Sequence, residues 1–164
     1  MAVFFPLYRW KKGQHSDFML WLLYALGAAI IWGVNYAVSG RLLERGMSPQ
    51  TLFLVDLIFG TLAVGLLISF SGKWSSTLLE LRQAQPDVIW LVIAVAAATA
   101  AGLLIFMSIE AKNATVASLI EVTYPLFTAF FAWALFRQTT LNLATIIGGL
   151  LIFAGVLIVA RGNR

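Results

Sequence analysis

The sequence contains no cysteine and only one histidine, His15, among its 164 residues. Without cysteine the chain can form no disulfide and carry out no thiol chemistry, and one histidine in a polar segment argues against a clustered metal site. Charged residues are also scarce, at 11% of the chain, whereas a soluble domain has about a quarter. These shortages exclude a water-soluble fold of this size.

Sequence motifs of enzymes are missing as well. No nucleotide-binding loop, histidine-based motif or serine nucleophile arrangement stands in a suitable context. The net charge of +4 could suggest nucleic-acid binding, but no basic stripe exists that would follow a line of phosphates. We therefore expect no catalytic site, no metal, no cofactor and no nucleic-acid partner.

The sequence does contain long apolar runs. Hydrophobic residues make up 61% of the chain, and polar breaks divide it into runs near the ~20 residues that cross ~30 Å of hydrocarbon. Continuous runs rich in Leu and Ala indicate helices, because barrel strands would alternate in polarity over about ten residues. The sequence predicts an all-α, multi-pass cell-membrane protein, a bundle of five transmembrane helices at about 18–39, 51–69, 88–109, 115–136 and 141–160.

The predicted membrane domain covers residues 18–161 and follows an N-terminal segment, residues 1–17. We interpret this first segment as interfacial and basic, with its aromatic side chains at the level of the lipid headgroups; a frayed tail explains it equally well. The aromatic residues in question are Phe4, Phe5, Tyr8 and Trp10.

Polar residues and prolines mark where the predicted helices begin. Ser48 and Pro49 open the second helix and Pro86 the third, since proline suits a first helical turn, where its missing N–H would be unpaired anyway. Thr140 is a candidate N-cap of the fifth helix. Between the second and third helices we expect a polar connection with one short amphipathic turn near residues 78–81.

The distribution of Lys and Arg gives almost no orientation signal. Five spans put the two termini on opposite sides, with six Lys and Arg residues on the N-terminal side and five on the other. The basic cluster before the first span favours a cytoplasmic N-terminus, while the near balance allows insertion in both orientations.

Two carboxyl side chains fall well inside the predicted spans, Asp56 in the second and Glu121 in the fourth. Each costs about 2.5–3.5 kcal/mol near the bilayer centre, so a functional site is the default explanation. Asp56 lies only one or two turns inside the membrane, and contact with headgroups or a neighbouring helix explains it equally well.

Glu121 is the stronger candidate because polar groups share its helix face. They stand three, four or seven residues away and comprise Ser118, Tyr124, Pro125 and Thr128. Pro125 lacks the N–H that would bond the carbonyl of Glu121, so a kink is expected there. A carboxyl group beside a broken hydrogen-bond ladder favours a cation or proton site. The alternative is an ordinary kink with Glu121 bonded to a neighbouring helix.

The first span carries Trp32, Asn35 and Tyr36 on one face. An amide without a partner is unfavourable in lipid, so Asn35 should face the interior of the bundle. The Asn35 side chain is expected either to contact a solute or to form a hydrogen bond with another helix, and the sequence does not decide between the two.

Four stretches of the sequence form a family pattern. They are Trp32-Gly33-Val34-Asn35-Tyr36, Met47-Ser48-Pro49, the run from Ala114 through Glu121 to Pro125, and Gly148-Gly149 with Gly155. This pattern resembles one EamA-type domain of the drug/metabolite transporter superfamily. The resemblance covers about residues 18–160 and is most specific in the last fifty.

The resemblance implies half of an inverted-repeat, ten-helix transporter with the solute path between its two halves. The sequence is similar to the single-domain members, which implies an antiparallel homodimer or pairing with a homologous half-transporter. Two departures leave the substrate and the coupling ion open. Arg137-Gln138 stands where the family often has an acidic residue, and Asp56 stands near where many members have a basic one.

We therefore expect a secondary carrier that moves a small metabolite or drug-like solute across the bilayer by alternating access. Glu121 would bind the coupling ion or a cationic solute. The other residues expected to line the path or complete the site are Asn35, Trp32, Tyr36, Tyr124, Pro125 and Asp56. The alternative is a non-transporting membrane subunit that binds or stabilises a larger assembly. A passive channel would need polar residues along most of a pore, and too few are present.

Overall fold

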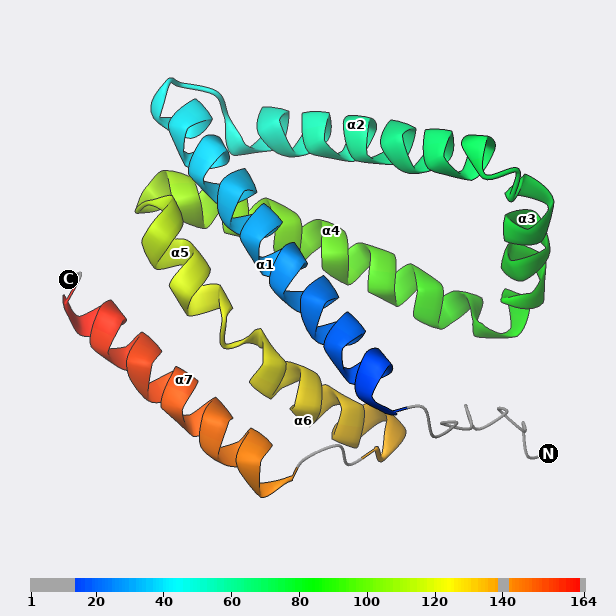
Figure 1. Cartoon of the computed structure of the whole chain (residues 1–164). Coiled ribbons are helices and arrows are strands. Elements are labelled where there is room, and N and C mark those ends of the chain that lie inside the picture. Colours follow the sequence, from blue (N-terminus) through cyan, green and yellow to red (C-terminus); the bar gives the residue numbers. More distant parts are fainter. Residues whose placement is uncertain (1–13, 139–141, 163–164) are drawn as a thin grey trace. The chain divides into compact units, whose positions relative to one another are not determined.

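The computed structural model describes residues 14–138 and 142–162, and the regular elements of this part of the chain are all helical. In chain order they are α1 (Gln14–Glu44), α2 (Pro49–Phe70), α3 (Trp74–Gln83), the short 3-10 helix η1 (Gln85–Asp87), α4 (Val88–Ala111), α5 (Ala114–Glu121), α6 (Tyr124–Phe136) and α7 (Leu143–Gly162) (Figure 1). The expected interfacial aromatic residues near the N-terminus and the candidate cap Thr140 lie outside the described residues.

Five stretches are long and apolar enough to cross a membrane, which confirms the predicted all-α, five-helix membrane class. They are Met19–Glu44, Pro49–Phe70, Gln85–Ala111, Ala114–Phe136 and Leu143–Gly162. The third stretch combines η1 with α4, and the fourth combines α5 with α6. The first stays helical beyond the expected end near residue 39, since charged residues limit the hydrocarbon segment and not the helix itself. Its last turn carries an exposed Arg41–Glu44 ion pair (3.3 Å).

The chain divides into two compact units, residues 1–35 and residues 36–164. The described part of the first unit is a single helical segment, the N-terminal portion of α1. The second unit holds the C-terminal end of α1 and every later helix. The residues of the buried core all belong to this second unit.

Side-chain caps begin three of the helices. Ser48 accepts a hydrogen bond from the backbone N–H of Thr51 (3.3 Å), and Pro49 occupies the first turn of α2, as the sequence predicts. Asn113 caps α5 in the same manner. Asn142 caps α7, since its Oδ1 accepts from the backbone N–H of residue 145 at 2.8 Å.

The buried core lies where the C-terminal ends of α1 and α4 meet the N-terminal parts of α2 and α5. Its buried members are Ser39, Leu43, Pro49, Leu52, Phe106, Ile109 and Ala117. Gly40 lets α1 approach closely, because a Cβ at that position would lie 3.1 Å from the Cβ of Ala114 in α5. Small residues at such contacts let helix backbones come together in a membrane, where no hydrophobic gradient drives them.

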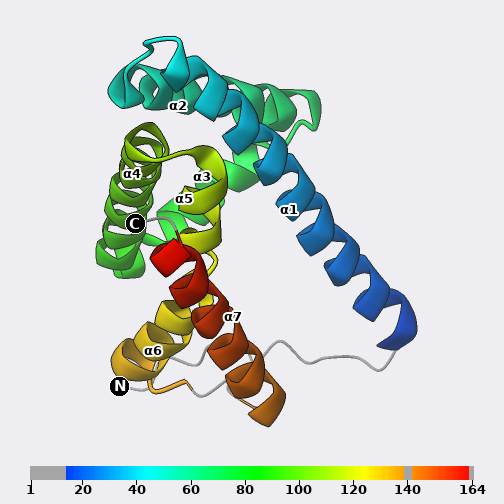
Figure 2. The same ribbon diagram turned by 90° about the vertical axis from the view of Figure 1, so that its left-hand side faces the viewer.

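Two further glycines mark close contacts between helices. In α4, Gly102 supports the ring of Phe53 from α2, and a Cβ there would collide with that ring. In α7, a Cβ at Gly149 would lie 2.5 Å from the Leu126 side chain of α6. These contacts hold α2 to α4 and α6 to α7, and α7 lies beside α5 in both views (Figures 1 and 2).

The connection between α2 and α4 contains a complete short helix, α3, rather than the single amphipathic turn expected there. The chain leaves α2 through Gly72, whose φ of +64° is readily available only to glycine. Figure 1 shows α3 running across the ends of α2 and α4.

Candidate functional site

The last residue of α5, Glu121, is held by α1. The Tyr36 hydroxyl donates a hydrogen bond to Glu121 Oε2 at 2.5 Å, joining residues 85 positions apart. Both side chains are partly buried, and Tyr36 also packs against the buried core. The structure therefore places this carboxyl group between two helices, at the edge of the packed end of the unit.

The helix breaks immediately after Glu121. Residues 122–123 separate α5 from α6, and Pro125 has no N–H to donate to the Glu121 carbonyl. The N–H of Leu126 bonds the carbonyl of Thr123 (3.0 Å), so the carbonyl of Val122 also loses its usual helical donor. Two backbone carbonyls beside the carboxyl group are thus without the helical partners that an unbroken span would supply.

Among the residues whose side chains the structure describes, no basic side chain forms an ion pair with Glu121. Within residues 19–138 and 142–162, the ion pair found is Arg41–Glu44, and neither Glu121 nor Asp56 forms one. The C-terminal end of a helix carries a partial negative charge, and the carboxyl group of Glu121 lies at that end of α5. The break therefore brings together a carboxyl group, backbone carbonyl groups and the Tyr36 hydroxyl.

The two other candidates on α1 belong to the first compact unit. Asn35 precedes Tyr36, and its Oδ1 is shielded from solvent and accepts no hydrogen bond from the described residues. Trp32 is one turn earlier and is exposed. An unpaired amide oxygen within an apolar span is costly, which fits a group that a ligand or a partner helix can satisfy.

Of the remaining expected residues, Tyr124 and Pro125 follow Glu121 across the break, whereas Asp56 lies on α2. Tyr124 is the first residue of α6 and is 64% exposed, and Pro125 lines a groove described below. Asp56 is exposed on α2, where it lines a shallow hollow of about 510 Å³. No hydrogen bond or ion pair of the described residues joins Asp56 to Glu121. Of the seven residues predicted from sequence, the structure brings Tyr36 and Glu121 into direct contact.

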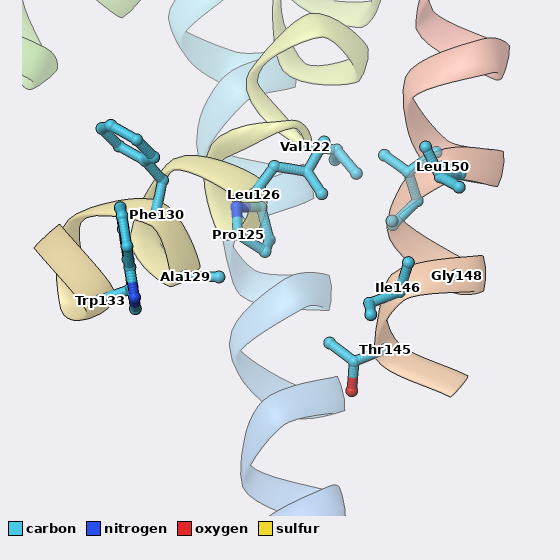
Figure 3. Close-up of a pocket in the computed structure, with 12 residues that line it drawn as sticks. Val122, Pro125, Leu126, Ala129, Phe130, Trp133, Thr145, Ile146, Gly148 and Leu150 are labelled. Carbon is cyan, nitrogen blue, oxygen red and sulfur yellow. The ribbon is translucent and has the colours of Figure 1, made fainter. Parts of the chain in front are cut away.

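A groove of about 530 Å³ opens between α5–α6 and α7, starting one residue after Glu121 (Figure 3). Its lining comprises Val122, Pro125, Leu126, Ala129, Phe130, Trp133, Thr145, Ile146, Gly148, Gly149, Leu150 and Ile152. The side chains are almost all apolar, with Thr145 as the exception. Of these residues, only Pro125 was a site candidate from the sequence. The helices are apolar on every side, so their sequence does not distinguish residues that line a groove from residues that face lipid.

Comparison with known proteins gives a consistent result. The chain matches the EamA-like transporter family over residues 19–161. An uncharacterized inner membrane transporter, YicL, from Salmonella typhimurium (strain LT2) is 29% identical over 146 residues, which cover 87% of this chain and 47% of that protein. The chain thus spans about half the length of the curated relative it matches. No solved structure shows significant similarity.

Proposed function

The chain belongs to the EamA-like transporter family, and from this premise we propose that it acts as a secondary carrier for a small metabolite or drug-like solute. The carrier would reside in the cell membrane and work by alternating access, with no covalent chemistry. Its apolar helices and its similarity to a protein named as an inner membrane transporter support this proposal.

The observation that carries the proposal furthest is the Tyr36–Glu121 hydrogen bond at the break between α5 and α6. A carboxyl group without a basic partner is expensive in a membrane and marks an ion or solute pathway by default. Broken helices place unpaired carbonyls at such sites in many carriers. Glu121 would therefore bind the coupling proton or a cationic group of the solute, and Tyr36 would hold the carboxylate when that charge is absent.

The other expected residues would contribute around this pair. Asn35 and Trp32 precede Tyr36 on α1, and Tyr124 and Pro125 follow Glu121 across the break. Asparagine and the amphipathic aromatics offer hydrogen bonds and flat apolar surface, which suit a small solute with both kinds of group. Asp56 would act from α2, where its exposed carboxyl group faces the hollow along that helix.

Transport would require a second five-helix unit, supplied by another copy of this chain or by a homologous half-transporter. The curated relative is about twice as long as the matched region, which fits two units in one functional protein. In addition, α6 and α7 contain no buried residue, so both helices have surface left for a partner or for lipid. An antiparallel arrangement fits the inverted repeats common among carriers.

Uptake into proteoliposomes tests the carrier proposal. The purified protein would be assayed against a panel of labelled metabolites and drug-like amines, with an inward proton gradient, an outward gradient and none. We expect saturable uptake of at least one class, faster than into protein-free vesicles. A folded, paired protein that moves nothing under any gradient, while copurifying with a larger membrane assembly, would support a non-transporting subunit instead.

The pairing proposal has its own test on α7. A Cβ at Gly155 would meet nothing within 4 Å, so Gly155→Leu should leave the unit itself intact. Because the chain lacks cysteine, single cysteines can be introduced at chosen positions for crosslinking in native membranes. We expect the leucine variant to crosslink less than the parent if α7 forms the interface. Reporters fused at Arg164 should appear on both sides of the membrane if the pair is antiparallel.

A further inference from the structure

Helix α3 is placed at the membrane surface by its two neighbours. α2 and α4 are both long and apolar enough to cross the bilayer, and α3 connects the end of one with the start of the other. The intervening chain of residues 71–87 contains Lys73, Glu80, Arg82 and Asp87, which cannot all enter hydrocarbon. The level of α3 is therefore fixed at the headgroup region or just outside it.

The turn that leads into α3 directs it sideways. After Gly72, the N–H of Lys73 bonds the carbonyl of Ile68 (3.1 Å), and the indole N–H of Trp74 donates to the Ser69 hydroxyl (2.9 Å). These bonds tie the first residue of α3 back to the last turn of α2. Figure 1 shows the helix continuing across the ends of α2 and α4 rather than away from them.

The two faces of α3 differ in polarity. Trp74, Leu78 and Leu81 share one face at offsets of four and seven residues. The opposite face carries Ser76, Glu80 and Gln83 at the same spacing, with Leu79 beside them as the apolar exception. No residue of α3 is buried, and the three apolar side chains are each about half exposed, so the described chain does not cover them.

Contacts with α2 show which way the apolar face points. Trp74 lines the hollow along α2 together with Val64 and Ile68, two residues of the preceding membrane span. Its face of α3 is therefore turned back toward the hydrocarbon side. Leu78 and Leu81 follow on the same face of α3 as Trp74 and are exposed.

Aromatic residues mark the headgroup level at this end of the second unit. Trp90 in the first turn of α4 contacts Phe136 at the end of α6, with ring centroids 5.1 Å apart. Arg137 lies over the ring of Trp133, 5.5 Å from its centroid. Tryptophan and arginine gather where hydrocarbon meets headgroups, which agrees with a helix at the same level.

We propose that α3 is an interfacial helix that binds the lipid surface directly. Trp74, Leu78 and Leu81 enter the boundary between headgroups and acyl chains, while Lys73 and Arg82 bind lipid phosphates from the two ends of the helix. In the described part of the chain neither basic side chain forms an ion pair, so both are available for phosphate. The helix thereby fixes the depth of α2 and α4 in the bilayer.

Spin labels provide the test, because every cysteine in the protein would be an introduced one. Leu78→Cys and Ser76→Cys would be labelled with a nitroxide in vesicles of phosphatidylcholine and phosphatidylglycerol, with Leu66→Cys as a reference within the membrane. We expect a several-fold higher ratio of oxygen to nickel-complex accessibility at position 78 than at 76. Equal, water-like ratios would overturn the proposal, and so would a label at 78 that neither reagent reaches, which would mean a protein partner.

The role of the two basic residues is tested in the same assay. Exchanging both in the Lys73→Gln/Arg82→Gln variant should shift the ratio at position 78 toward its value in water. Arg45→Gln, at the other end of the spans, is the matched control and should leave the ratio unchanged. If the double variant also leaves the ratio unchanged, the assignment of Lys73 and Arg82 to lipid phosphates is wrong.

Discussion

The two ends of the second unit differ in how they are packed. At one end α1, α2, α4 and α5 enclose the whole set of buried residues, among them Phe106 and Ile109. Toward the other end, α3, η1 and α6 contain no buried residue, and neither does α7, which lies beside both α5 and α6. Apolar surface facing lipid is not costly in a membrane, so the open end needs no core of its own to persist.

Under the proposed carrier function, this difference in packing suggests that the two ends have different roles. The packed end would act as a fixed frame, held by helix contacts at Gly40 and Gly102. The break at residues 122–123 lies between this frame and the more exposed α6, which makes it a natural pivot. Glu121 stands at that boundary, bonded to Tyr36 of the frame. Under the proposed function, a cation or proton bound at Glu121 would change the contacts of both the packed end and α6.

The largest stability effect is expected in the frame. Phe106 is 2% exposed, so Phe106→Ala should open a cavity and lower the free energy of unfolding by about 2 kcal/mol. The loss should fall below that of a soluble core, because both states remain in an apolar medium. Phe59→Ala is the matched control, since Phe59 is 66% exposed. An unfolding assay in bicelles measures both variants. If both lose the same free energy of unfolding, the packed end is no more tightly packed than the exposed surface.

A smaller effect is expected from a pair of glycines. Gly102→Ala should force the Phe53 ring to move and cost about 1–3 kcal/mol, because a Cβ at 102 collides with that ring. Gly60→Ala meets nothing within 4 Å and should be neutral or stabilise α2 by up to about 1 kcal/mol. Thermal unfolding in the same detergent compares the two. Opposite signs would support the packing between α2 and α4, and similar losses would argue against it.

The smallest stability change should come at the pivot. Pro125→Ala restores an N–H that can bond the Glu121 carbonyl, so α5 and α6 should tend to fuse and stability should change by less than about 1 kcal/mol. Uptake should nevertheless slow, because the break would be stiffer. Pro86→Ala, outside the longer helices, is the control and should keep normal uptake. Slowed amide exchange at residues 122–126 with unchanged transport would show that the break is not used as a pivot.

Much of the architecture could be predicted from sequence, and the reason is physical. Charged breaks such as Arg41 to Gly46 must leave the hydrocarbon, so they delimit the spans directly. The start of α2 at Ser48 and Pro49, and the missing N–H of Pro125, are local properties of the chain and can be predicted from its sequence. The family resemblance rests on the same local stretches.

Pairing between distant residues could not be predicted in the same way. Tyr36 and Glu121 were both candidates, yet their hydrogen bond depends on how α1 packs against α5. In a soluble helix the apolar stripe would reveal the packed face, but in a membrane the lipid face is equally apolar. For the same reason the sequence did not indicate the groove at Leu126 and Trp133. The sequence also predicted only one turn of α3, because the polar residues around Leu78 and Leu81 suggested a connection and not a complete helix.

The measurement that tests the central claim most directly is gradient-driven uptake by Glu121 variants, once a solute has been identified. Glu121→Gln keeps the size and much of the hydrogen bonding but removes the titrating charge, so driven uptake should collapse while insertion and pairing persist. Glu121→Asp should retain partial uptake with a shifted pH dependence. Tyr36→Phe is the companion control, because it keeps the ring against the core and loses only the hydroxyl bond. Normal driven uptake by Glu121→Gln at normal expression would contradict the account and leave Glu121 as a packing contact, where a hydrogen bond is worth about 0.6 kcal/mol.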